Sequence, residues 1–152
     1  MTYESRIKAN PAYLQALGRA FYNFQCLELM AIWTIVVLSS DGYGSVPRGK
    51  GATAGKIAGA LNNAIQNTAL PLDQPLPAQL AKFHAEFRKA VELRNKLLHA
   101  QPYTAPDRTQ QLFYDGGPAW PIDDVYAAAK RFEAVAVWAA ESFWDDLVKA
   151  RP

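Results

Sequence analysis

A long apolar pattern near the N-terminus constrains the fold more than any other feature of this chain. Asn10-Pro11 marks a helix start, because Asn accepts hydrogen bonds from free backbone N–H groups and Pro fits the first turn. Apolar residues then recur every three or four positions: Leu14, Leu17, Phe21, Phe24, Leu27, Met30, Ile32, Trp33, Ile35, Val36, Val37 and Leu38. This spacing predicts one long helix, amphipathic at first and then buried nearly all round. A strand over 32–38 is the alternative, since its β-branched content is high, but the helical period enters it without a break.

The middle of the chain predicts two more helices. The glycine-dense segment 39–56 indicates a loop, and the shorter helix after it carries Ile57, Leu61, Ala64 and Ile65 at helical spacing. Prolines within 71–77 end that helix. A third helix begins near Pro77 and runs to about Ala100, where Gln101-Pro102 stops it.

The C-terminal third predicts a small hairpin and a last helix. Residues 103–121 are not helical, with a strand over 110–114, a turn over 115–117 and a returning strand over 119–121. Asp123 or Asp124 then caps the last helix. The expected fold class is therefore all-α: a single domain over 1–152, with four to five helices and a small hairpin or irregular segment before the last one.

Composition excludes several classes of protein. Among 152 residues, Lys plus Arg is 16 and Asp plus Glu is 14, so the formal charge of +2 gives no argument for a strongly electrostatic nucleic-acid binder. The single cysteine, Cys26, rules out a disulfide framework or a Cys-based zinc site within one chain. The most hydrophobic stretch is shorter than the ~20 residues that span a bilayer. The N-terminus shows no apolar signal core. We therefore expect a cytoplasmic protein with no membrane association, no metal and no cofactor.

The segment Arg94-Asn95-Lys96-Leu97-Leu98-His99 carries the most chemistry. Arg94 lies on the apolar stripe of its helix and therefore points toward protein or a partner, where an unpaired charge is costly. His99 is a side chain that can transfer protons near neutral pH, and Arg94 offers a planar fork to phosphate oxygens. Asn95, on the same helix face as His99, can orient a sugar, a phosphate or the imidazole. This set suits attack of an RNA 2′-hydroxyl on its own phosphodiester without a metal.

The same six residues resemble the R-x4-6-H signature of the HEPN family, here in the short form Arg94-Asn95-x-x-x-His99. The expected helical bundle, with the motif near the end of a long helix, is similar to that family, and the run 17–24 resembles the first helix of some members. The resemblance implies a metal-independent endoribonuclease, usually a homodimer whose motifs face each other across a cleft, and often a toxin or defence effector with an antitoxin protein. Some members keep the fold without catalysis. One toxin branch has Tyr two residues after the His, where this chain has Gln101.

A purely structural interpretation competes with this one, because basic residues are favoured at any helix C-terminus. Lys96 fits a solvated or phosphate-steering role better than catalysis. Tyr103, just after the motif, is the aromatic side chain that we most expect to contact a base. His84 lies about four turns before His99 and is expected at the surface or boundary of the bundle.

The segment 44–51 reads G-x-x-x-x-G-K, which resembles the start of a phosphate-binding loop. Gly51 stands where Ser or Thr would hold magnesium, and a helix precedes the segment where the motif needs a strand. A flexible loop is the preferred interpretation. In an intermediate one, Arg48, Lys50 and Lys56 meet RNA phosphates beside the cleft.

The sequence therefore predicts a dimeric HEPN-like endoribonuclease acting on RNA, with His99 as general acid and base, Arg94 on the phosphate and Asn95 as the orienting residue. The alternative is a non-catalytic helical module that binds RNA, a nucleotide or a partner protein. One observation separates them. A pairing of Arg94 with a carboxylate of its own chain, with His99 facing solvent, favours the alternative.

Overall fold

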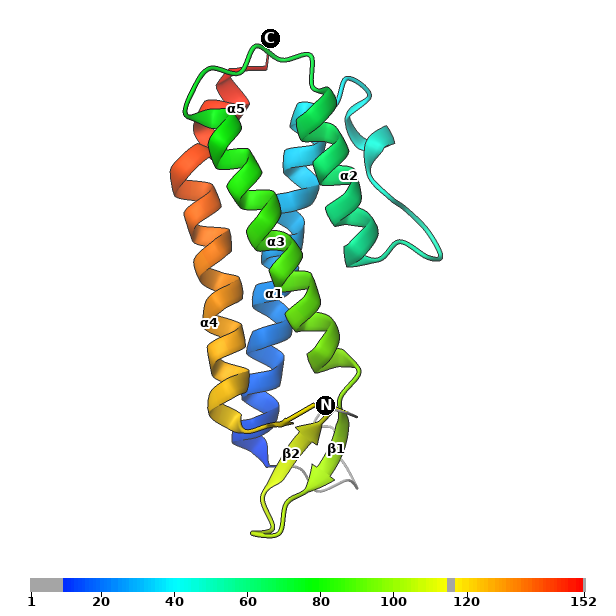
Figure 1. Ribbon diagram of the computed structural model, residues 1–152, viewed down its shortest axis with the longest axis vertical. Coiled ribbons are helices and arrows are strands. Elements are labelled where there is room, and N and C mark those ends of the chain that lie inside the picture. Colours follow the sequence, from blue (N-terminus) through cyan, green and yellow to red (C-terminus); the bar gives the residue numbers. More distant parts are fainter. Residues whose placement is uncertain (1–9, 115–116, 152) are drawn as a thin grey trace, which may run out of the picture.

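Three long helices lie side by side in the computed structural model, which describes residues 10–114 and 117–151 (Figure 1). They are α1 (Pro11–Leu38), α3 (Leu76–Leu98) and α4 (Ile122–Ala139). Helix α2 (Ala54–Asn67) covers part of α1 and α3, and α4 continues through a π-helical turn (Ala140–Trp144) into α5 (Asp145–Lys149). The fold is therefore mostly helical, as the periodicity predicts.

Helix α1 begins and ends where the sequence predicts. Asn10 Oδ1 accepts a hydrogen bond of 2.9 Å from the backbone N–H of Ala12, and Pro11 occupies the first turn. The helix continues without a break to Leu38, so the alternative strand over 32–38 is wrong. By length and composition α1 could cross a membrane, with a mean hydropathy of 1.5, but 44% of that window is buried inside the bundle. Its most extensive packing is against α4.

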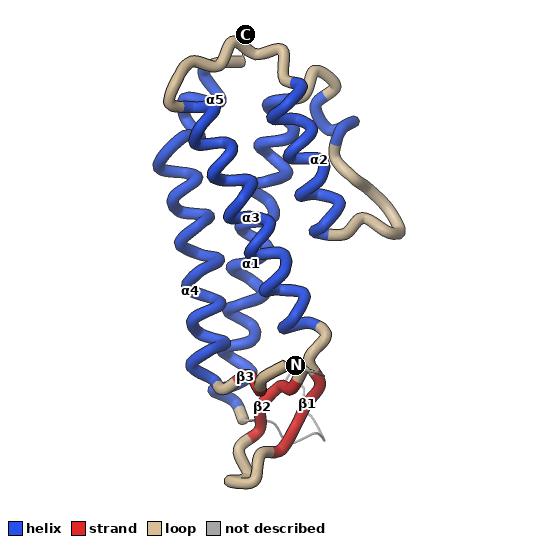
Figure 2. The backbone as a smooth tube through the Cα atoms, in the orientation of Figure 1, coloured by secondary structure: helices blue, strands red, loops and turns tan. Residues whose placement is uncertain are grey.

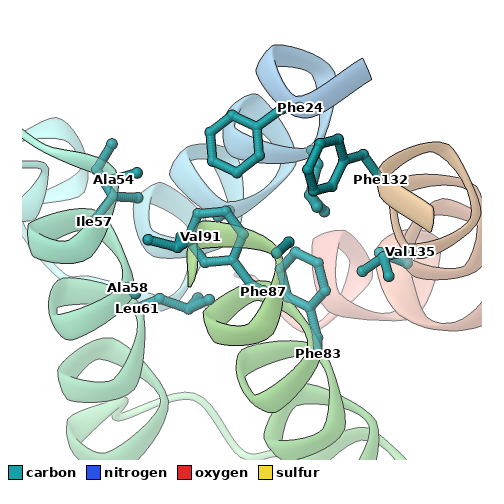
Figure 3. Packing of buried hydrophobic residues seen from close by; sticks show 14 of the residues in the cluster. Phe24, Ala54, Ile57, Ala58, Leu61, Phe83, Phe87, Val91, Phe132 and Val135 are labelled. Atoms are coloured by element: carbon teal, nitrogen blue, oxygen red, sulfur yellow. The ribbon is translucent and has the colours of Figure 1, made fainter. Parts of the chain in front are cut away.

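Aromatic side chains form the centre of a hydrophobic core that helices α1 to α4 enclose. Figure 3 shows Phe24 of α1, Phe83 and Phe87 of α3 and Phe132 of α4 meeting beside the apolar face of α2. The Phe24 and Phe132 rings meet edge to face with centroids 5.3 Å apart, and Phe24 stacks on Phe87 at 6.3 Å. The spacing of these residues on their helices therefore does define the core.

A three-stranded antiparallel sheet at one end of the bundle corrects the all-α prediction (Figure 2). The predicted hairpin forms from β2 (Gln110–Phe113) and β3 (Ala119–Trp120), although turn residues Asp115 and Gly116 lie outside the described residues. The additional strand β1 (Gln101–Thr104) pairs with β2, with Gln101 opposite Phe113 and Thr104 opposite Gln110. Gln101-Pro102 does stop α3, but by starting a strand.

Two local predictions need correction. Pro121, not Asp123 or Asp124, precedes the first turn of α4, and both carboxylates lie inside that turn, near the positive end of the helix dipole. The predicted loop 39–56 ends earlier, since Thr53 caps α2 by accepting a hydrogen bond from the Lys56 N–H at 3.3 Å. It also contains a short 3-10 helix at Gly42–Ser45. The N-terminal segment 1–9, where the sequence shows no signal core, lies outside the described residues.

Candidate functional site

Arg94 sits in the last turns of α3 and points toward α1. Its guanidinium carbon lies 5.3 Å from the centroid of the Phe24 ring, and the side chain is half-buried. Nη1 donates a hydrogen bond of 3.0 Å to Asn95 Oδ1, whereas Nε is buried and has no hydrogen-bond partner among the described residues. A buried donor left unsatisfied is costly, so Arg94 carries one N–H that no group of the described residues satisfies.

Glu28 of α1 is the carboxylate that interacts electrostatically with Arg94. Burial raises the pKa of Glu28, and the nearby Arg94 charge partly opposes that rise. Within the part of the chain that the structure describes, no ion pair of 4.0 Å or less includes Arg94. The two charges therefore face each other without a direct contact. Glu28 is not among the site residues that the sequence predicts, although it and Arg19 are the two charged residues of α1.

His99 lies at the very end of α3 and is exposed. It is the C-terminal cap residue, and its backbone N–H donates to the Asn95 carbonyl at 3.0 Å. Asn95 is half-buried and Lys96 is exposed in the same last turn. Arg94 and His99 are five residues apart, which is about 7.5 Å along the helix and about 140° around it. No hydrogen bond or ion pair among the described residues joins their side chains.

The remaining predicted binding residues come from two other elements. Tyr103 lies on β1, the strand that directly follows the motif; its side chain is 45% exposed, and its ring lies 5.9 Å from that of Phe113. The glycine-dense loop carries Arg48 and Lys50, both exposed, and runs alongside α2 (Figure 1). Arg48 donates to the Tyr43 carbonyl at 3.0 Å and lies over the Tyr43 ring.

The loop does not have the context of a phosphate-binding loop. Helix α1 precedes it, where that motif needs a strand, and Gly44 already lies in the short 3-10 helix. Gly49 and Gly51 adopt positive φ angles of 75° and 99°, which glycine tolerates and other residues avoid. These two glycines are explained by the turns of the loop.

Arg94, Asn95 and the carboxylate of Glu28, which is distant along the chain, form one half-buried cluster. His99, Lys96 and Tyr103 are exposed where α3 meets the sheet. Within residues 10–114 and 117–151, no group of three or more His, Cys, Asp or Glu side chains is placed to hold a metal ion. Comparisons of the chain with protein-family models, curated proteins and solved structures found no match. Chemistry and geometry alone therefore carry the functional argument.

Proposed function

We propose that this protein is a HEPN-type, metal-independent endoribonuclease. The observation that carries the proposal is the state of Arg94: a half-buried guanidinium with an unsatisfied Nε, no direct ion pair among the described residues, and an exposed histidine at the end of the same helix. A cation held in this way binds an anion with little further ordering cost. The phosphodiester of RNA supplies such an anion together with a 2′-hydroxyl nucleophile.

The proposed reaction is transfer of the RNA phosphate to the neighbouring 2′-oxygen. The 2′-oxygen attacks phosphorus while His99 takes its proton, and the bond from phosphorus to the 5′-oxygen breaks. The departing 5′-oxygen receives a proton from an imidazolium, so the products are a 2′,3′-cyclic phosphate and a 5′-hydroxyl. Arg94 stabilises the charge that develops on the phosphate oxygens, and Asn95, already hydrogen-bonded to Arg94, fixes the guanidinium plane.

A homodimer is part of this proposal, because one chain offers only one His99. The face of α1 that points away from the core carries exposed apolar side chains: Leu14 (53% exposed), Tyr22 (71%), Leu29 (51%) and Trp33 (40%). Gly18 lies among them, and a Cβ there would meet no atom within 4 Å. Large apolar patches on a protein surface mark interaction sites. In the dimer, His99 of the partner subunit would supply the proton for the leaving 5′-oxygen.

A second candidate function, a non-catalytic helical module that binds RNA, a nucleotide or a partner protein, has a specific observation in its favour. His99 faces solvent, and Arg94 interacts electrostatically with Glu28 of its own chain. The exposed His99 is one part of the arrangement expected for a binding module. The other part, an ion pair of Arg94 with a carboxylate of its own chain, is not formed among the described residues. An antitoxin partner and a cytoplasmic location remain predictions of the nuclease proposal.

The deciding experiment incubates labelled structured RNA with the purified protein in EDTA. Wild-type protein is expected to leave 2′,3′-cyclic phosphate ends, and His99→Ala and Arg94→Gln are expected to lose this activity. Arg19→Gln, which changes the same charge on an exposed part of α1, is the matched control and should cleave like wild type.

Three outcomes contradict the proposal. Intact RNA with every protein would favour the binding module. Equal cleavage by wild type and His99→Ala would show that His99 does not take part. A requirement for magnesium would exclude the mechanism written above.

A further inference from the structure

A groove of about 440 Å³ between α2 and α3 lies outside the site described above. Its volume is within the range of small-molecule sites. The residues that line it include Gly55, Gly59, Asn62, His84, Arg88 and Glu92. Two of them, His84 and Arg88, lie one turn apart on α3, and the glycines lie one turn apart on α2.

His84 reaches the groove from α3. Its ring lies near the backbone carbonyl of Ala58 on α2, close enough for that acceptor to influence its pKa. Burial and the nearby Arg88 charge lower the pKa of His84, and the Ala58 carbonyl opposes that shift. The lowered pKa favours the neutral imidazole, in which one nitrogen can donate and the other can accept a hydrogen bond. The half-buried ring therefore lines the groove, in agreement with the boundary position that the sequence indicates.

Arg88 supplies the positive charge of the groove. It is exposed and, among the described residues, belongs to no ion pair. Glu92 lines the same groove one turn further along α3. A bare anion would meet this carboxylate as a repulsive neighbour, whereas a ligand with both an anionic end and hydroxyl or N–H donors would match it.

The two glycines keep the α2 side of the groove open. Glycine in the middle of a helix costs stability relative to alanine. At Gly59 a Cβ would meet no atom within 4 Å, so packing inside this chain does not require a glycine there. Because Gly55 and Gly59 carry no side chains, the backbone of α2 borders the groove directly and leaves room for a ring.

We propose that the α2–α3 groove binds one nucleotide unit of the RNA strand, with Arg88 on its phosphate and His84, Asn62 and Glu92 on its sugar or base. The inference rests on the proposed ribonuclease function and extends the substrate-binding surface away from the reacting phosphate. Helical geometry supports this extension, because positions 84, 88, 95 and 99 fall on one face of α3. The face spans about 22 Å from His84 to His99, which is long enough for several nucleotides.

The first test titrates the full chain with adenosine 5′-monophosphate and follows backbone amide signals by NMR. The expected shifts are at Gly55, Gly59 and Arg88, with smaller changes at Asn95. Inorganic phosphate and adenosine, titrated separately, should each bind more weakly than the nucleotide. Equal binding of phosphate alone, or shifts confined to the Arg94 cluster, would overturn the proposal.

The second test measures binding of a 2′-O-methyl RNA oligonucleotide, which lacks the nucleophilic hydroxyl and stays intact. Arg88→Gln is expected to weaken binding about tenfold, as loss of a hydrogen bond to a charged group does. Gly59→Leu should weaken binding comparably while melting at least as high as wild type, since leucine favours a helix. Arg19→Gln, with the same charge change outside the groove, should bind like wild type. Unchanged affinity in both groove variants would refute the proposal.

These measurements separate the two proposals, because neither requires cleavage. If wild type cleaves RNA and both Arg88→Gln and Gly59→Leu bind RNA as wild type does, the groove proposal is wrong and the nuclease proposal is retained. Nucleotide binding at Gly59 without cleavage of any RNA would support the groove and reject the nuclease.

Discussion

The Tyr13 hydroxyl on α1 donates a hydrogen bond of 2.7 Å to the backbone carbonyl of Trp120 on β3. The same oxygen accepts a hydrogen bond of 2.9 Å from the backbone N–H of Leu112 on β2. One buried side chain thus ties the start of the long helix to two neighbouring strands, beside the segment where α3 ends and the sheet begins. Because the exposed motif residues lie at this end of the bundle, the Tyr13 contact helps to define where they are held.

Tyr13→Phe should lower the free energy of unfolding by about 1–3 kcal/mol, because it leaves a backbone donor and acceptor without their partner in a partly buried place. Urea denaturation followed by far-UV circular dichroism measures this loss. Tyr22→Phe removes the same hydroxyl from a side chain that is 71% exposed and serves as the control. An equal effect of the two substitutions would show that the Tyr13 bridge contributes nothing particular.

Glu28→Gln should change how stability depends on pH. The folded-state pKa of Glu28 is raised above its ordinary value of 4.5, chiefly by burial, so the fold favours the protonated carboxyl. This contribution is complete below pH 4.5 and is lost as pH rises through the folded-state pKa. The free energy of unfolding of the variant, relative to that of wild type, should therefore be higher at pH 7 than at pH 4. Urea denaturation at the two pH values measures this difference. Glu133→Gln, at an exposed position on α4, should show no such difference.

The same Glu28→Gln variant should bind the 2′-O-methyl RNA oligonucleotide more tightly than wild type, because Arg94 loses the nearby negative charge of Glu28, the one acidic side chain of α1. A several-fold gain, larger at low salt, is expected when affinity is measured by fluorescence anisotropy. Arg94→Gln should abolish the gain in the double variant. If the double variant retained it, another cation would be responsible.

Phe87→Ala should cost about 3–5 kcal/mol, since the ring is fully buried and stacks on Phe24 and Phe83. Calorimetric melting reports the loss directly. Val137→Ala, at a side chain that is 46% exposed on α4, should cost far less. Comparable losses would mean that the aromatic cluster is not the centre of stability.

Tyr22→Glu should convert the proposed dimer into a monomer without unfolding it, because the side chain is 71% exposed and a charge there would be buried only by a partner. Sedimentation velocity measures the oligomeric state, and circular dichroism checks the fold. Gln66→Glu, an exposed change on α2, is the matched control. A wild-type chain that sediments as a monomer, or that instead floats with anionic lipid vesicles, would contradict the dimer.

Local sequence was sufficient to define α1. Its start depends on Asn10 and Pro11, which act on their immediate neighbours, and its length follows from apolar spacing alone. The hairpin strands 110–113 and 119–120 were also predictable, because β-prone residues flank a turn signal. The interactions that specify these elements lie within a few residues along the chain.

The tertiary structure decided β1, the start of α4 and the surroundings of Arg94. Residues of β1 are all exposed and show no alternation, so only pairing with β2 makes them a strand. The last helix starts at Ile122 because the preceding Trp120 is held in the sheet by Leu112 and Tyr13, and this leaves no capping role for Asp123.

Sequence alone determined which residues could carry chemistry in this protein: Arg94, Asn95 and His99 stand at the end of one helix whatever packs around them. Only the tertiary structure placed Glu28 near Arg94 and His84 near Ala58, since each pair joins residues of two different helices. Burial and the nearest charge set the pKa of a group and decide whether a cation is already paired. Burial and nearby charges both depend on how the helices pack. Residue identity therefore fixed the possible chemistry, and contacts between distant segments fixed the state of each group.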